Sequence, residues 1–71
     1  MFIITNSNVI INCDHVKLIK YGRNNDKYSI IAEPGGTITE IDTEEDAKKV
    51  ISFLYDRLIN NVPVDFRYLK W

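Results

Sequence analysis

The only cluster of chemically reactive side chains in the sequence is Cys13-Asp14-His15. A cysteine nucleophile needs a neighbouring base that holds it as the thiolate, and a third group that orients the base. In an extended strand Cys13 and His15 would point to the same side, because side chains alternate. Adjacent strand residues seldom reach the geometry of such a pair, and no glycine-framed motif surrounds this one. The pattern therefore indicates a partly buried cysteine beside a surface histidine, and we expect no enzymatic activity.

A metal centre has too few ligands in this sequence. Cys13 and His15 are the single cysteine and the single histidine, and a structural zinc site needs four ligands. A site shared between two chains is the one arrangement left open. A single cysteine also forms no internal disulfide, which is typical of a reducing cytoplasm. We expect no metal, no cofactor and a cytoplasmic protein.

The glycine-rich stretch Pro34-Gly35-Gly36-Thr37 is the next candidate binding motif. A phosphate-binding loop opens a helix and is accompanied by a lysine. This loop instead lies between two strand-like stretches. It predicts a hairpin turn in which glycine adopts positive φ.

A basic and aromatic stretch defines an alternative function. Single-stranded nucleic acid is bound by rings that stack on bases and cations that follow the backbone. The tyrosines also suit a strand pair, and lysines protect strand edges. A net charge of −1 lacks the basic excess of a dedicated polyanion binder. The candidate nucleic-acid surface consists of Lys17, Lys20, Tyr21, Arg23, Lys27 and Tyr28.

The elements that must position these residues are mostly strands. Short β-branched and aromatic runs, separated by Asn, Gly and Pro, predict five strands. Thr43 as N-cap and three acids in the first turn predict the start of a helix. Pro63 indicates that this helix has ended before it. Alternation from Val62 to Tyr68 predicts a tail strand. The predicted single domain spans 1–71, with strands 2–5, 9–12, 15–21, 27–33 and 37–41, helix 44–60 and tail strand 62–68.

The predicted fold class is α+β: a bent antiparallel sheet of five or six strands with one amphipathic helix packed on one face. The helix residues expected to face the sheet fall within a sector of about 100°; they are Ala47, Val50, Ile51, Leu54 and Leu58. Several strands are apolar on both faces, which is unusual for an antiparallel sheet with one solvated side. One helix covers only one side, so apolar surface should remain for a partner.

This apolar excess favours a small non-enzymatic protein-interaction module that self-associates. A 71-residue domain without disulfide or metal gains stability by forming a homodimer or larger oligomer. No apolar run approaches the ~20 residues that span a membrane, so the expected partner is a second copy, another protein or both. Aromatic residues are common in interface cores, and the predicted interface residues are Phe53, Ile59, Phe66, Tyr68 and Trp71.

Two local patterns carry a resemblance across the whole chain. The step Asn12, Asp14 and Val16 follows the first strands, and Thr43–Ala47 begins the helix with acids. In these features the chain resembles small β-rich orphan proteins of Gram-positive bacteria and their phages. The resemblance implies a bacterial or phage origin and a β-rich fold with one main helix. A concrete version of the predicted module is then an inhibitor of a host protein, encoded by a phage or mobile element.

Overall fold

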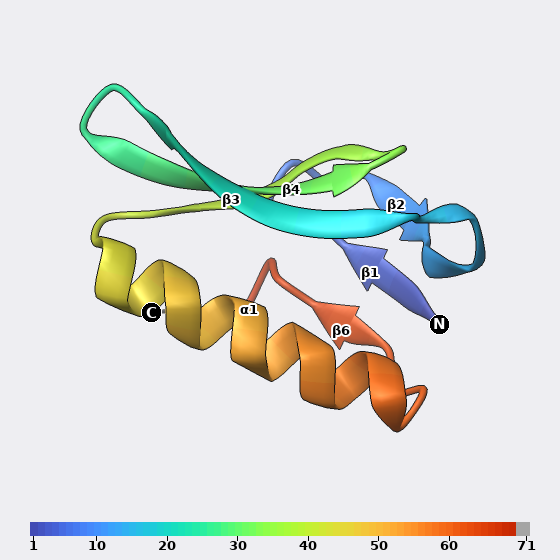
Figure 1. Ribbon diagram of the computed structural model, residues 1–71. Coiled ribbons are helices and arrows are strands. Elements are labelled where there is room, and N and C mark those ends of the chain that lie inside the picture. Colours follow the sequence, from blue (N-terminus) through green and yellow to red (C-terminus); the bar gives the residue numbers. More distant parts are fainter. Residues whose placement is uncertain (70–71) are drawn as a thin grey trace.

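The computed structural model describes residues 1–69 and contains six strands, one α-helix and one 3₁₀ turn (Figure 1). In chain order these are β1 (Phe2–Ile4), β2 (Ile10–Asn12), η1 (Cys13–His15), β3 (Leu18–Asn24), β4 (Lys27–Glu33), β5 (Gly36–Ile41), α1 (Glu44–Ile59) and β6 (Val64–Asp65). The predicted α+β class is confirmed.

The strands form two three-stranded sheets rather than the single antiparallel sheet expected. The first has the order β2-β1-β6, in which β6 pairs parallel to β1. The second has the order β3-β4-β5 and is antiparallel throughout. The two meet where the Asn6 N–H donates to the Ile38 carbonyl oxygen at 3.3 Å. The expectation of one sheet was wrong because the chain after the helix returns to β1 and not to β5.

The helix follows its sequence signals closely. The Thr43 hydroxyl oxygen accepts a hydrogen bond from the Asp46 N–H at 3.1 Å, as expected for an N-cap. At the other end the Asn60 N–H still bonds to the Asp56 carbonyl, and Asn61 adopts φ 55°. The helix therefore ends one residue before the predicted boundary. Its residues Ala47, Val50 and Leu54 are buried, and α1 packs across the β3-β4-β5 sheet (Figure 1).

The chain after the helix closes the core beside α1. Phe66 is fully buried, and its N–H donates to the Ile4 carbonyl at 2.8 Å. Its carbonyl accepts from the Asn6 side-chain amide at 2.9 Å. The Phe66 ring meets the Phe53 ring edge-on, with centroids 6.5 Å apart. Phe66 thus joins β1, the first loop and the helix in one core.

The tail strand predicted at 62–68 is shorter in the structure and comprises only Val64–Asp65. The Asp65 carboxylate accepts a hydrogen bond from the Arg67 N–H at 3.0 Å and forms an ion pair with the Arg67 guanidinium at 2.7 Å. This local contact turns the backbone after Asp65, as Asp commonly does with the N–H two residues on. The alternation of buried and more exposed residues is therefore limited to 64–66.

The remaining boundaries shift by up to three residues. The strand expected at 15–21 lies at Leu18–Asn24, because Asn12 accepts from the Asp14 N–H and bends the chain into η1. The strand expected at 2–5 ends at Ile4, since the Thr5 hydroxyl accepts from the N–H groups of Ser7 and Val9. The strand expected at 9–12 begins at Ile10, that at 37–41 begins at Gly36, and that at 27–33 is confirmed.

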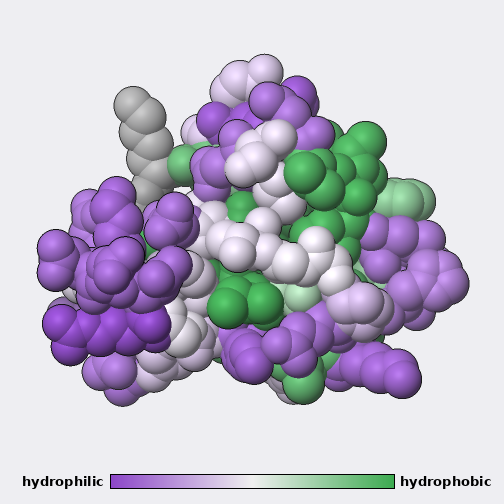
Figure 2. All heavy atoms as spheres, turned by 90° about the horizontal axis from the view of Figure 1, so that it is seen from above, coloured by the Kyte–Doolittle hydropathy of each residue, from purple (hydrophilic) through white to green (hydrophobic). Residues whose placement is uncertain are grey.

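The outer face of the β3-β4-β5 sheet carries less apolar surface than its sequence suggests. Figure 2 views the molecule from this side and shows hydrophilic residues over much of it, with apolar residues between them. Lys20 forms an ion pair with Glu33 at 2.9 Å, and Lys27 forms one with Asp42 at 3.5 Å. The split into two sheets buries Ile3 and Ile11 in the core. Ile3 and Ile11 therefore do not add to the apolar surface, and apolar patches remain on this face between the charged residues (Figure 2).

The glycines of the turn between β4 and β5 lead to a prediction about the free energy of unfolding. Gly35 and Gly36 have φ 141° and 98°, and a Cβ on Gly35 would lie 3.2 Å from Ile11 Cγ2. We expect Gly36→Ala to lower the free energy of unfolding by about 1–3 kcal/mol through backbone strain. Gly35→Ala should lower it further because of the added contact. Urea unfolding measures both.

Gly22→Ala is the matched control for these variants. Gly22 lies within β3 outside the positive-φ region, and a Cβ there meets no atom within 4 Å. We expect its free energy of unfolding to change by less than about 0.5 kcal/mol. Equal stability of Gly22→Ala and Gly36→Ala would contradict the strain argument.

Candidate functional site

The reactive side chains of Cys13, Asp14 and His15 do not form an activated nucleophile in this structure. Cys13 is half-buried in η1, and its N–H donates to the Met1 carbonyl at 3.0 Å. Burial raises the pKa of the Cys13 thiol; the positive N-terminus opposes this shift and Asp14 adds to it. His15 is exposed. Within residues 1–69, no group of three His, Cys, Asp or Glu side chains is arranged to hold a metal ion. Because burial raises its pKa, the Cys13 thiol is protonated at neutral pH.

The candidate nucleic-acid surface is divided between the two faces of the β3-β4-β5 sheet. Tyr21 lies opposite Ile30, which is fully buried, so Tyr21 faces the core side. Its neighbour Lys20 points to the other face, because side chains alternate along a strand. Tyr21 and Tyr28 form an edge-on pair with centroids 6.2 Å apart, and both are half-buried. Lys20 and Lys27 therefore lie on the opposite face from the two rings, whereas Arg23, opposite Tyr28, lies on the same face as the rings.

The basic side chains of this candidate surface are also partly engaged. Lys20 and Lys27 are in the ion pairs described above. The Arg23 guanidinium donates from Nε to the Asn25 carbonyl at 3.2 Å. Lys17 lies at the entrance to β3 and lines a groove on the core side of the sheet. This geometry does not favour the nucleic-acid alternative.

The predicted interface residues also separate. Phe66 is fully buried, which corrects its expected place on a surface. Phe53 is half-buried against Phe66, with the Arg57 guanidinium 4.8 Å from its ring centroid. Ile59 and Tyr68 are exposed by 63% and 78%, and Trp71 lies outside the described residues. The tail runs back along α1, away from the helix end that carries Ile59 (Figure 1).

A larger group of exposed apolar side chains lies on the flank of α1 that faces the start of β3. Tyr55, Leu58 and Leu18 are exposed by 66%, 39% and 45%. They border a groove of about 300 Å³. The groove is lined by Cys13, Val16, Lys17, Leu18, Ile19, Ile51, Leu54, Tyr55 and Leu58. We call this surface the α1–β3 groove. Eight of its nine lining residues are apolar or aromatic.

The α1–β3 groove exists because the two flanks of α1 are covered differently. On one flank Phe53 packs against Phe66 from the returning tail. The other flank carries Ile51, Tyr55 and Leu58, spaced i, i+4 and i+7 along one side of the helix. It faces only the chain leading into β3, which is an edge strand. No second sheet covers this flank within residues 1–69.

Sequence reasoning missed most of this site. Leu58 was predicted to be in the helix face that packs on the sheet, yet it is partly exposed. Val16 and Leu18 were predicted to be ordinary strand residues. The available signal was the width of the helix stripe, since Tyr55 and Ile59 extend it beyond what one sheet covers.

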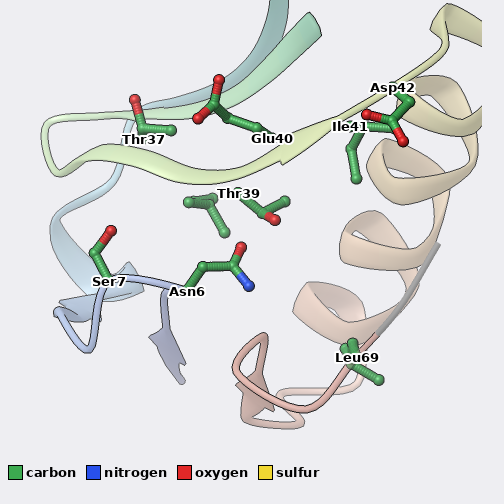
Figure 3. A pocket seen from close by; sticks show the side chains of 9 residues that line it. Asn6, Ser7, Thr37, Thr39, Glu40, Ile41, Asp42 and Leu69 are labelled. Atoms are coloured by element: carbon green, nitrogen blue, oxygen red, sulfur yellow. The ribbon is translucent and has the colours of Figure 1, made fainter.

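A second groove, of about 430 Å³, runs along β5 and is more polar (Figure 3). It is lined by Asn6, Ser7, Thr37, Ile38, Thr39, Glu40, Ile41, Asp42 and Leu69. Its walls therefore come from the free edge of β5, the loop after β1 and the tail. We call this surface the β5 groove.

Comparison of the chain with models of known protein families, with curated proteins and with solved structures gave no match. Among the described residues, no helix has the length and apolar character needed to cross a bilayer.

The environment of Cys13 leads to a prediction about how the alkylation rate of its thiol depends on pH. Because burial raises its thiol pKa, the reactive thiolate is scarcer at a given pH than in an unburied cysteine. We expect iodoacetamide to alkylate native protein several-fold more slowly at pH 8 than urea-unfolded protein, with the native rate rising at higher pH. Mass spectrometry of timed samples measures both rates. Faster alkylation of the native protein at neutral pH would show an activated thiolate.

Proposed function

We propose that the protein is a non-enzymatic protein-interaction module that forms a homodimer through the α1–β3 groove. The observation that carries this proposal is a protruding apolar ridge beside an apolar groove. Tyr55 and Ile59 are each more than 60% exposed on the helix. Leu58 and Leu18 form the groove edge next to them. Exposed apolar surface of this kind is typical of protein interfaces.

The groove is large enough to receive an aromatic side chain. A cavity of about 150 Å³ is enough to hold a benzene ring, and the α1–β3 groove measures about 300 Å³. In a two-fold dimer each subunit presents the same patch, so each ridge meets the partner's groove. Full burial of one large apolar side chain contributes roughly 1.5–3 kcal/mol. Several such side chains from each subunit supply the driving force.

A dimer interface of standard size would occupy a modest fraction of the molecular surface. A standard interface buries about 800 Å² per partner, which is roughly one sixth of the total accessible surface of 4796 Å². The exposed charged residue Lys17 lines the groove and provides a polar edge. This arrangement of an apolar centre and a polar edge is common among interfaces.

A heterologous partner would use the same surface. If the chain acts as an inhibitor of a host protein, we place that contact on the α1–β3 groove as well. Binding of the host protein and dimer formation would then compete, because one apolar patch serves both.

The test is the concentration dependence of molecular mass. We expect sedimentation equilibrium of the wild-type protein to show a monomer–dimer equilibrium, with Tyr55→Glu weakening association at least tenfold. Tyr55 lies in the middle of an exposed helix face, and glutamate is a good helix former. Circular dichroism should therefore show an unchanged fold.

Tyr68→Glu is the matched control, because Tyr68 is also largely exposed but belongs to the tail. We expect it to leave the dimer intact. A strict monomer at millimolar wild-type concentration would overturn the proposal. Loss of association in Tyr68→Glu but not in Tyr55→Glu would move the interface to the tail.

A further inference from the structure

The free edge of β5 is the second surface from which a binding property follows. β5 is the outer strand of the β3-β4-β5 sheet. On its free side the loop after β1 reaches it at one point, where the Asn6 N–H donates to the Ile38 carbonyl oxygen. Beyond that point the edge continues through Glu40 to Asp42.

The direction of the β5 backbone groups follows from the pairing of β4. In an antiparallel ladder, the N–H and C=O groups of alternate residues point to the same edge. The Glu33 carbonyl accepts from the Lys17 N–H on the β3 side of β4, so the backbone groups of Ser29 face β3 as well. Glu40 lies opposite Ser29 in the register, so its N–H and C=O point to the free edge. Outside the sheet ladder, the Glu40 backbone groups make no backbone hydrogen bond within residues 1–69.

The β5 groove also contains a polar side chain without a partner. Thr39 is 7% exposed and lines the groove. Its hydroxyl makes no hydrogen bond to any of residues 1–69. Figure 3 shows the Thr39 side chain between β5 and the loop of Asn6 and Ser7. Among the described residues no buried side-chain oxygen lacks a partner, so the Thr39 hydroxyl oxygen reaches solvent in the groove. There it can accept or donate a hydrogen bond to an incoming ligand.

We propose that the β5 groove binds an extended, basic segment of another protein by strand addition. The segment pairs its backbone with the Glu40 N–H and C=O, as in other cases where a peptide extends a sheet. Alternate side chains then point to opposite faces. Those on one face enter the groove beside Thr39 and Leu69. Those on the other face lie next to the Glu40 carboxylate.

The charge of the edge selects a basic segment. Glu40 is exposed and forms no ion pair with any of residues 1–69. Asp42 contributes further negative charge, although Lys27 lies 3.5 Å from it. A lysine or arginine opposite Glu40 would form a favourable cross-strand pair.

The same charge disfavours a second copy as the occupant. Antiparallel pairing of two β5 edges about Glu40 would place the two Glu40 carboxylates opposite each other, which is destabilising. The basic edge of β3 in a second copy is also less suitable, because Lys20 is already paired with Glu33. The binding surface is distinct from the α1–β3 groove and does not depend on dimer formation.

The test uses a hexapeptide of alternating lysine and valine with blocked ends, titrated into the full-length protein and followed by ¹⁵N NMR. We expect the largest shifts at residues 38–42 and slower hydrogen exchange of the Glu40 amide. Glu40→Lys should weaken binding about tenfold and should instead bind the matched peptide of alternating glutamate and valine. Tyr55→Glu should bind the lysine peptide as wild type does, whether or not the protein is a dimer.

Asp56→Lys is the matched charge control, because it makes the same change in net charge on the exposed surface of α1. We expect it to retain the affinity of the wild type for the lysine peptide. If Asp56→Lys and Glu40→Lys weakened binding of the lysine peptide equally, the effect would come from overall charge alone. That result would overturn the proposal. So would equal binding of both peptides by the wild type, no binding of either, or shifts that lie outside β5.

Discussion

The burial of Phe66 is the interaction on which the rest of the structure depends. Its backbone is held by Ile4 and Asn6, and its ring by Phe53. These contacts bring the chain after α1 back to β1 and complete the β2-β1-β6 sheet. Without them a 71-residue chain with one helix would leave a second side of its core exposed. Val64 and Phe66 of the tail are therefore part of the core and are not free for a partner.

The same packing makes the helix asymmetric, and both candidate surfaces follow from that asymmetry. The tail covers the Phe53 flank of α1, so the flank with Tyr55 and Leu58 stays open beside β3. The tail also carries Leu69 to the free edge of β5 and forms one wall of the polar groove there. One surface is apolar and suited to a second copy. The other has a free strand edge and negative charge, which suit a basic segment.

The sequence predicts local structure well and the arrangement of the elements poorly. The Thr43 N-cap, the helix that follows it and the glycine turn before β5 are correct, because each depends on interactions between near neighbours in the chain. The parallel pairing of β6 with β1 depends on residues about 60 positions apart, and no local pattern reports it. That pairing is also why Phe53, off the main helix stripe, is partly buried. The expected interface residues included Ile59, which borders the open flank, but also Phe66, which is in the core.

The most direct test of the central claim is a map of contacts between subunits. Isotope-filtered NOE spectra of an equal mixture of ¹³C-labelled and unlabelled protein report only protons that approach each other across the interface. The account predicts intermolecular contacts from the Tyr55 ring and Ile59 methyl groups to the methyl groups of Leu18 and Leu58. Intermolecular contacts confined to Tyr68 and the tail, or none at millimolar concentration, would contradict it.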